Sequence, residues 1–372
     1  MTACRSLVFL AGLLAGLAAN AAPAPPTDIP AQAWVLQDAL TGRVLAEHRA
    51  QETVAPAGLV NLMTTVVVLD AVARGQIALS DRVPISERAW KTPGTRMFAR
   101  LGEDVTVEKL LEGLAVVSAN DAAIALAEHV SGSEKSFVER MNALGAELGL
   151  ENTHFANPTG FDDADQYSTA MDVTRLSSVL ARGYPQYFGW YARKAFEYNT
   201  IEQYNRNALL WRDPSADGIK AGHTPKAGYC LVGSAARDGM RLIATVMGAP
   251  DELSRTEAAG RLLDYGFEAF ETHRVLGPDM PAGHAAVRGG QSASVPIGVA
   301  ENVYVTVARG SGDGVELQVE IPAELTAPVS AGREAGRAIV RIDGRPDREV
   351  RLQTLESVPP GGFWDRVIEW FR

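Results

Sequence analysis

A buried amide and a serine at a helix break are the first candidates for chemistry in this sequence. The stretch "APAGLVNLMTT" (55–65) turns apolar after Gly58 and stays so almost all round, which predicts a buried helix. A buried amide such as that of Asn61 needs hydrogen-bond partners, and glycine costs about 1 kcal/mol relative to alanine in a helix. Ser118 lies in "SAND" (118–121), where serine, asparagine and aspartate are also natural N-cap residues. A hydroxyl can act as a nucleophile, whereas an amide can only donate and accept hydrogen bonds.

The surrounding segments predict the elements that would position these residues. Residues 33–48 show two strand-like runs around the glycine-containing turn "LTGR", and further strand-like runs lie at 218–235 and 240–248. Between them are helical patterns at 107–130, broken at "SAND", and at 134–148. Strands, then helices, then strands again predict an α+β domain that closes on its own N-terminus.

The C-terminal part of the chain has a different pattern. From about 278 to 357, short alternating stretches such as "VYVTVAR" and "VELQVEI" are separated by turn residues, which predicts a small all-β second domain. The chain then ends in "PPGGFWDRVIEWFR", whose aromatic and aliphatic residues fall on one arc of a helical wheel. This separation of apolar from charged residues is typical of an interfacial amphipathic helix with weak, reversible membrane binding. A helix that packs on the protein's own β domain is the alternative.

The N-terminal residues read as a targeting segment. An apolar run, "LVFLAGLLAGLAA" (7–19), follows Arg5 and precedes small residues, as in a secretory signal peptide that is cleaved near Ala21 or Ala22. A short membrane anchor is the alternative, although the run is short and rich in alanine and glycine. Removal of this segment would leave Cys230 alone, with no intramolecular disulfide and no cysteine-rich metal site. Export without disulfides indicates a bacterial periplasm.

Composition narrows the class of partner. The chain has 372 residues, of which 46% are hydrophobic and 22% charged, and this suits a soluble globular protein with a sizeable core. The formal net charge is −10, and no basic run is present. We therefore expect no nucleic-acid partner and no general attraction to anionic lipid.

Several stretches of the sequence resemble one family. They include "VLQDALTGRVLAE", "SANDAAIALAE", "NTHFANPTGF", "NRNALLW", "DGIKAGHTPKAGYCLVGSA" and the final "GGFWDRVIEWF". The chain is identified by them as similar to the low-molecular-mass penicillin-binding proteins that act as serine D-alanyl-D-alanine carboxypeptidases. The resemblance implies a β-lactamase-like, DD-peptidase-like α+β domain with an antiparallel sheet flanked by helices, a β-rich second domain and a C-terminal amphipathic anchor. It also implies that no cofactor is needed.

With this resemblance the chain divides into five parts. We expect a signal peptide at 1–21, an extended, mobile leader at 22–32, the DD-peptidase-like domain at 33–276, the all-β domain at 277–357 and the amphipathic helix at 358–372. The implied location is the periplasm, peripheral on the outer face of the inner membrane. The implied partners are peptidoglycan stem peptide or cell-wall enzymes, with weak membrane contact through the final helix.

The family's first motif, S-x-x-K, is degenerate in this sequence. In the family its serine attacks the terminal peptide carbonyl, and its lysine, one helical turn on, serves as the base. These two positions fall on Gly58 and Asn61, which supply neither group. None of the lysines, at 91, 109, 135, 194, 220 and 226, has a serine three residues before it. A threonine version, "TVEK" (106–109), opens a charged helix of solvent-exposed type and is a weak candidate.

The second and third motifs are better preserved. The resemblance implies that Ser118 passes protons and that Asn120 holds the substrate backbone, as in the family's S-x-N motif. The K-T-G motif becomes "KAG" (220–222), with Ala221 in place of the hydroxyl that would bind a carboxylate. That loss removes a hydrogen bond worth about 1.5–3 kcal/mol. Further substrate-binding residues are carried over by position: Lys220, Gly222, His223, Arg206 and Arg255.

Three hypotheses of function follow. The main one is a catalytically silent member of the family that acts by binding stem peptide or a cell-wall partner. The second is residual D-Ala-D-Ala carboxypeptidase activity, with Ser118 as an alternative nucleophile or a water in the space at Gly58, and Lys220 as base. The third is an interaction protein with no ligand in the old cleft. We also expect Asn61 to find its hydrogen-bond partners in Ser118 or Asn120.

Overall fold

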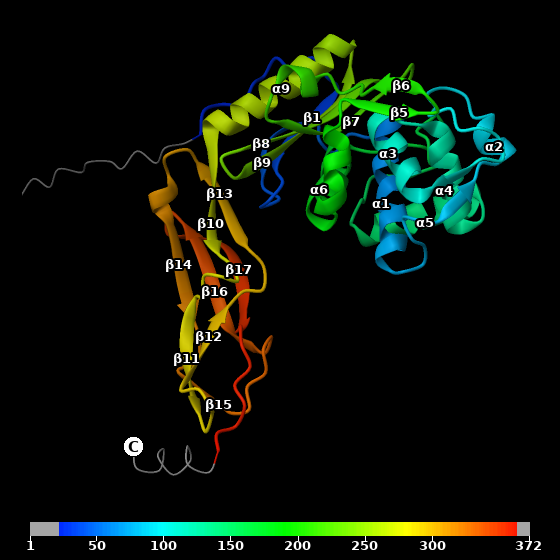
Figure 1. The fold of residues 1–372 in the computed structure, drawn as a ribbon. Helices are drawn as coiled ribbons and strands as arrows, with labels where there is room; N and C mark the ends of the chain where they lie inside the picture. The colour runs from blue at the N-terminus through cyan, green and yellow to red at the C-terminus, as the bar shows by residue number, and fades with distance from the viewer. Residues whose placement is uncertain (1–21, 363–372) are drawn as a thin grey trace, which may run out of the picture.

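A computed structural model describes residues 22–362, which form two units joined end to end (Figure 1). The first unit is built on a five-stranded antiparallel sheet with the strand order β2-β1-β9-β8-β7. Its strands are β1 (Ala33–Asp38), β2 (Val44–His48), β7 (Ala216–Thr224), β8 (Gly228–Arg237) and β9 (Met240–Ala249). The first and last parts of the chain therefore share one sheet, as the sequence predicts, and β1 turns into β2 at "LTGR".

Helices cover both faces of this sheet. The α-helices are α1 (Val60–Ala73), α2 (Glu87–Trp90), α3 (Val107–Val117), α4 (Asn120–Ser131), α5 (Glu134–Glu147), α6 (Ala170–Gly183), α7 (Pro185–Phe188), α8 (Leu209–Arg212) and α9 (Glu252–Ala269). Short 3-10 turns, η1 (Ala57–Leu59) and η2 (Gly189–Ala192), and two small hairpins complete the unit, with strands β3 (Arg82–Pro84), β4 (Asp104–Thr106), β5 (Ala195–Tyr198) and β6 (Ile201–Tyr204).

The alternation of side chains in β1 separates two cores. Val35 packs in the core that contains α1, α3, α4 and α6, whereas Leu36 packs in the core beneath α9. Helix α1 lies inside the larger core, where every residue from Val60 to Leu69 is buried. This confirms the prediction of a helix that is apolar all round, and it explains why the helix persists whatever chemistry its first turn carries.

The helix break at "SAND" is real, but its capping differs from the expectation. Ser118 ends α3 in the left-handed conformation (φ 57°) instead of starting the next helix, and Ala119 is the N-cap of α4. No side-chain cap bond is formed at that end of α4. The prediction that these polar residues act as N-caps is therefore wrong, because the side chains of Asn120 and Asp121 bind the backbone of the loop after α2.

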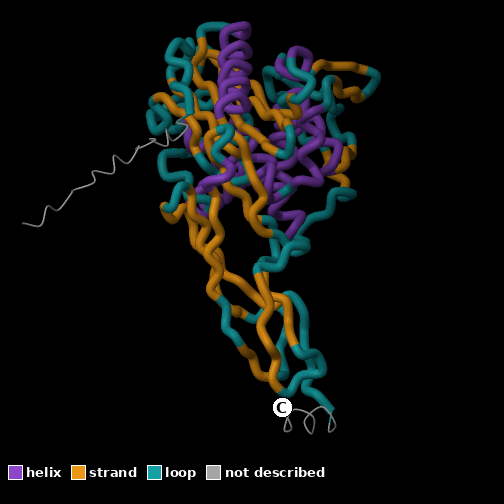
Figure 2. Tube along the Cα trace, turned by 90° about the vertical axis from the view of Figure 1, so that its left-hand side faces the viewer, coloured by secondary structure: helices purple, strands orange, loops and turns teal. Residues whose placement is uncertain are grey.

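The second unit consists almost entirely of strands and loops (Figure 2). It begins with β10 at Phe270, before the sequence-based boundary at 276/277. Strands β10 and β13 form one antiparallel pair, and a six-stranded sheet has the order β14-β16-β17-β12-β11-β15. The bounds are β10 (Phe270–Leu276), β11 (Gly283–Arg288), β12 (Ser294–Gly298), β13 (Val303–Ala308), η3 (Gly312–Gly314), β14 (Val315–Glu320), β15 (Glu324–Thr326), β16 (Glu334–Ile342) and β17 (Arg345–Thr354).

A buried carboxylate joins the two units. Asp38, at the end of β1, is fully buried and accepts hydrogen bonds from the hydroxyls of Thr272 on β10 and Thr306 on β13, the latter at 2.9 Å. The hydroxyl of Thr41 also lies 2.7 Å from that of Thr306. Hydrogen bonds between buried groups fix geometry, because a lost partner leaves an unsatisfied donor or acceptor. The turn between β1 and β2 thus holds the second unit.

The leader is extended, but it packs against the first unit. Its Asp28 pairs with Arg261 of α9 at 2.5 Å, Tyr265 donates to the Pro23 carbonyl at 2.9 Å, and Ile29 is buried. The expected signal peptide (1–21) and residues 363–372 of the expected C-terminal helix lie outside the described residues. The expected start of that helix at 358 is wrong, because Val358 is buried and bridges Val329, and Pro360 bridges Gly290, so that residues 358–362 pack on the second unit. Within residues 22–362, no helix has both the length and the apolar character that crossing a membrane requires.

Candidate functional site

The start of α1 lies beside strand β7, and Gly58 is at the contact. A Cβ placed on Gly58 would lie 3.6 Å from the Ala221 carbonyl oxygen and 3.9 Å from Oδ1 of Asn61. These are ordinary van der Waals distances, so the backbone at this position leaves room for a side chain. The structure therefore contains a small space at position 58 that glycine does not fill.

Asn61 is buried below this space, but its partners are not those expected from the sequence. Its Nδ2 donates to the carbonyls of Pro158 and Thr159, at 3.2 Å each, and no bond to Ser118 or Asn120 is found. That expectation is wrong, because the loop "NPTGF" (157–161) lies directly over the first turn of α1. Among the described residues, Oδ1 of Asn61 has no hydrogen-bond partner. An unsatisfied buried acceptor is costly, and this one lies 3.9 Å from the place of a Cβ on Gly58.

The S-x-N pair lies at the junction of α3 and α4. Ser118 is half-buried at the end of α3. Asn120 is buried, its Nδ2 donates to the Pro93 carbonyl at 3.0 Å, and its backbone N–H donates to the Thr95 carbonyl at 2.8 Å. Asn120 therefore positions the loop after α2, and this part of its amide is not free for a ligand.

Lys220 points from β7 to the end of α3. It is 2% exposed, and its Nζ donates to the carbonyls of Leu114 and Ala115, the latter at 3.1 Å. These carbonyls belong to the last turn of α3, where partial negative charge accumulates. Burial lowers the pKa of Lys220 to about 7, because the charged amine is removed from water. This amine thus caps the helix that ends at Ser118, and its charge is poorly solvated.

The remaining residues of the third motif have separate environments. Ala221 is 6% exposed and packs in the core beneath α9, whereas His223 is exposed and its ring lies 4.1 Å from that of Tyr229. Gly222 is half-buried between them. The third motif therefore lies on strand β7, and its position 221 offers only a methyl group.

The two arginines differ in what they can bind. Arg255 is 4% exposed and donates to the carbonyls of Gly222 (3.1 Å) and Arg206 (3.2 Å) and to Glu252 (2.8 Å). Burial lowers its pKa, and the Glu252 carboxylate opposes that shift. Arg255 is therefore a positioning residue that holds β7 against the loop before α8. Arg206 itself is exposed and remains available to an anionic group.

Two residues of the site were not among the candidates from the sequence. Gly160 has φ +90°, and a Cβ on it would lie 2.1 Å from the Ala57 carbonyl oxygen, so the loop approaches η1 as closely as only glycine allows. Asp121 is buried and accepts the backbone N–H groups of Met97, Phe98 and Ala99 at 2.9, 3.0 and 3.3 Å. The "NPTGF" turn and the polar "SAND" stretch were the available signals.

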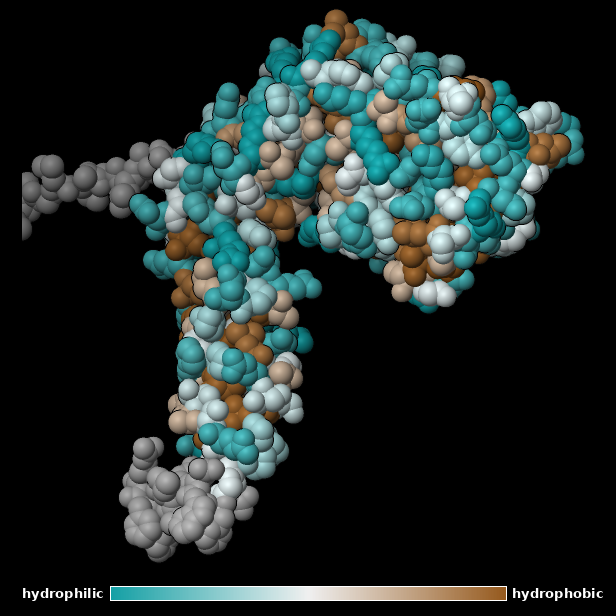
Figure 3. All heavy atoms as spheres, viewed as in Figure 1, coloured by the Kyte–Doolittle hydropathy of each residue, from teal (hydrophilic) through white to brown (hydrophobic). Residues whose placement is uncertain are grey.

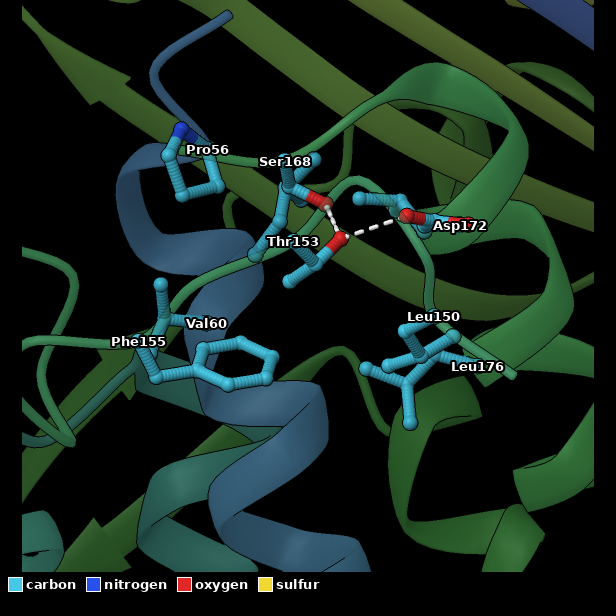
Figure 4. Close-up of a pocket in the computed structure, with 10 residues that line it drawn as sticks. Pro56, Val60, Leu150, Thr153, Phe155, Ser168, Asp172 and Leu176 are labelled. Atoms are coloured by element: carbon cyan, nitrogen blue, oxygen red, sulfur yellow. Dashed lines mark hydrogen bonds between the residues drawn. The ribbon is translucent and has the colours of Figure 1, made fainter. Parts of the chain in front are cut away.

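A small cavity lies behind the start of α1 (Figure 4). Pro56 and Val60 line it on one side, and Thr153 on the other donates to Asp172 at 2.8 Å and lies 2.8 Å from the Ser168 hydroxyl. Its volume of about 10 Å³ holds at most a single water molecule. No group of His, Cys, Asp and Glu suited to a metal ion occurs within the described part of the chain.

Two family models match consecutive parts of the chain. The model described as "D-alanyl-D-alanine carboxypeptidase" matches residues 18–251, and that described as "Penicillin-binding protein 5, C-terminal domain" matches residues 270–360. The chain belongs to the D-alanyl-D-alanine carboxypeptidase family. The resemblance inferred from the motifs is thereby confirmed, as are the α+β peptidase-like unit and the separate all-β unit.

Relatives and solved structures of this carboxypeptidase family agree over nearly the whole chain. "D-alanyl-D-alanine carboxypeptidase DacA" of Haemophilus influenzae is 37% identical over 351 residues, covering 93% of this chain and 89% of the relative. DacC of Escherichia coli, with the same description, is 37% identical over 378 residues, covering 100% and 94%. The solved structure of penicillin binding protein 5 from Haemophilus influenzae has a TM-score of 0.78 at 37% identity and covers 91% of this chain and 100% of its own.

Proposed function

We propose that this member of the carboxypeptidase family binds peptidoglycan stem peptide without cleaving it. The observation that carries the proposal lies in η1 and the first turn of α1, where Gly58 and Asn61 stand at the positions that the resemblance assigns to the nucleophile and the base. Position 58 has no hydroxyl, and Asn61 holds a neighbouring loop through its amide nitrogen. Neither residue can form or activate an acyl-enzyme.

The expected loss of rate is large. In another serine hydrolase, removal of the nucleophile or of its base costs about a million-fold in kcat, and binding with the oxyanion hole leaves roughly 10³–10⁴ over water. Both groups are missing here, and Ala221 also removes a hydroxyl from the strand. Turnover by the family's covalent route is thus excluded by chemistry.

Binding has more support, because a free strand edge and several polar side chains lie near the first turn of α1. Strand β7 is the last strand of the sheet within the described residues, and extended peptides add to such edges through main-chain hydrogen bonds. The half-buried Ser118 and the exposed His223 and Arg206 add polar groups near that edge. A cell-wall enzyme docked on the second unit is the alternative partner. We place the protein in the periplasm, with weak membrane contact through the aromatic C-terminal residues 363–372.

Residual hydrolysis through Ser118 is the second candidate, and one observation favours it. The pKa of Lys220, lowered to about 7, would leave a large fraction of this amine neutral and able to accept a proton. Against this, the hydrogen bonds of Nζ go to two carbonyls of α3, which favour the protonated form.

Two assays on the full-length purified protein test the proposal. Isothermal titration calorimetry with a pentapeptide ending in D-Ala-D-Ala should show binding, and the peptide should be recovered intact. A fluorescent penicillin should not label the protein, while an active relative labelled in parallel controls the reagent. Penicillin labelling, or release of D-Ala that disappears in Ser118→Ala, would establish the hydrolytic candidate instead. Absence of peptide binding would overturn the binding role.

A further inference from the structure

A groove of about 400 Å³ lies at the α2 end of the first unit, beside the site already described. It is lined by Trp90, Lys91, Arg96, Phe98, Ala99, Arg100 and Asp121. Trp90 is 42% exposed and Phe98 is 43% exposed, and Figure 3 shows apolar atoms at the surface of this end of the molecule. Aromatic side chains that remain exposed around a groove are typical of ligand or partner contacts.

The floor of the groove is held rigidly. The buried carboxylate of Asp121 accepts three consecutive backbone N–H groups, from Met97 to Ala99. The central residue, Phe98, has φ +65°, a left-handed conformation that is strained for a bulky side chain. The three hydrogen bonds stabilise this conformation, and it directs the phenyl ring outward. The shape of the groove is therefore formed before any ligand arrives.

Two arginines of the groove lack a carboxylate partner. Lys91 pairs with Glu87, whereas no ion pair within 4 Å is found for Arg96 or Arg100 among the described residues. The Glu103 carboxylate accepts the backbone N–H of Arg100 at 2.9 Å, and Nη1 of Arg96 donates to the Trp90 carbonyl at 3.3 Å. The guanidinium of Arg96 lies 5.3 Å from the centroid of the Phe98 ring, and its Nε is buried with no acceptor among the described residues. The cations that line the groove outnumber the single carboxylate there, the buried Asp121, although the chain has a net charge of −10. Neighbouring guanidinium groups of this kind are complementary to an anionic ligand.

The loop that follows α2 (residues 93–99) connects the groove to the candidate functional site. Asn120 holds the loop at Pro93 and Thr95, and the adjacent Asp121 holds it three residues further on. A Cβ on Gly94 would lie 2.8 Å from Nδ2 of Asn120, so this loop is in direct contact with the start of α4. A ligand long enough to leave the site along this loop would enter the groove.

We propose that the groove binds the sugar-bearing, carboxylate-rich part of a muropeptide whose peptide end lies beside β7. Arg96 and Arg100 bind its carboxylates, and the rings of Trp90 and Phe98 cover the apolar face of its sugar. This inference rests on the proposed function, since it assigns a second contact region to the same ligand. It explains why three cations and two aromatic rings gather on an acidic protein.

Calorimetry with matched probes tests the groove. The probes are N-acetylmuramyl pentapeptide, the same pentapeptide without the sugar, and the muramyl peptide with its carboxylates amidated. The muramyl peptide with free carboxylates should bind most tightly, and raised salt should weaken that binding. In the double variant Arg96→Gln/Arg100→Gln its affinity should fall about tenfold or more. Trp90→Ala should remove the advantage of the sugar while the bare pentapeptide binds as before.

The control is a second double variant with the same change in charge. Arg345→Gln/Arg351→Gln alters exposed arginines on β17 of the second unit and should leave all affinities unchanged. If the first double variant unfolds, Arg100→Gln alone, at an exposed side chain, repeats the test. Equal binding of the three probes, or affinities that survive both groove variants, would overturn the groove and leave peptide binding intact. Failure of every probe to bind the unaltered protein would overturn both proposals.

Discussion

Gly58 and Gly222 touch through their backbones, and only one of the two has to be glycine. A Cβ on Gly222 would lie 2.7 Å from the backbone nitrogen of Gly58, which is too close for any side chain. A Cβ on Gly58 would lie 3.5 Å from Cα of Gly222, an ordinary contact. Packing thus requires glycine on β7 but not at the start of α1. The glycine at 58 has no structural explanation, which points to chemistry as the property that changed.

Restoring a side chain at this position should stabilise the fold. The backbone conformation at position 58 is open to residues other than glycine. In Gly58→Ser the unfolded chain has less conformational freedom, which adds about 0.4–1 kcal/mol to the free energy of unfolding. The new hydroxyl can also donate to Oδ1 of Asn61, which has no partner among the described residues. Urea denaturation followed by circular dichroism measures the free energy of unfolding.

The matched substitution at Gly222 should change the free energy of unfolding in the opposite direction. Gly222→Ala should destabilise the protein by about 1–3 kcal/mol, because strand β7 has to move away from the start of α1. A loss of stability in Gly58→Ser as large as that in Gly222→Ala would show that the space at position 58 is not real.

Reversion of three positions should restore reactivity towards penicillin. In Gly58→Ser/Asn61→Lys/Ala221→Thr, the serine, its base and the strand hydroxyl return together, and we expect a fluorescent penicillin to label the protein covalently. Omitting Gly58→Ser from the set gives the control, which should remain unlabelled. An inert triple variant with a native circular dichroism spectrum would mean that the site has diverged beyond these positions.

Stability should rise between pH 7 and pH 9 because of Lys220. Its pKa is lowered to about 7 in the folded protein, so in this range the unfolded chain binds more protons and folding is favoured as pH increases. The rise is roughly 2 kcal/mol over these two pH units. From about pH 8 upward the buried Cys230, whose pKa is raised to about 11, acts in the opposite direction, because the thiol of the unfolded chain ionises first and offsets part of the rise. Denaturation curves at both pH values should show this rise in the unaltered protein, and Lys220→Met should lack it. Identical slopes in the two proteins would contradict the assignment.

The junction between the two units should depend on one carboxylate. Asp38→Asn replaces an acceptor that faces Thr272 and Thr306 with a donor, and leaving such buried groups unsatisfied costs about 1–3 kcal/mol. We expect a lower free energy of unfolding and a separation of the unfolding of the two units, detected by calorimetry. Asp313→Asn, at an exposed residue of η3, is the control. Unchanged cooperativity in Asp38→Asn would show that other contacts hold the junction.

Patterns that depend on one strand or helix were predicted well from the sequence. The apolar run after Leu59 gave a helix buried on all sides, and the "LTGR" turn, the break at "SAND" and the alternating C-terminal stretches correspond to observed elements. Each of these features follows from local periodicity or turn chemistry, and tertiary contacts strengthen it.

Side-chain partners were predicted less well. The contacts of Asn61 were expected across the site, but they go to "NPTGF" (157–161), because a loop distant in sequence lies over the helix. Arg255 and Lys220 were expected to face a ligand, yet both bind backbone carbonyls. A sequence motif specifies which residue is present, whereas the direction of a long side chain depends on packing that no single motif encodes.

The missing hydroxyl at position 58 also changes what occupancy of the site would mean. An active hydrolase removes each ligand that it captures, so the fraction of protein occupied depends on how fast the product leaves. If the proposed function holds, every encounter ends in release of an unaltered molecule, and occupancy follows the free ligand concentration and the dissociation constant alone. Such a protein would respond reversibly to the supply of uncleaved wall precursors, and its signal would decay over the lifetime of the complex once that supply stops.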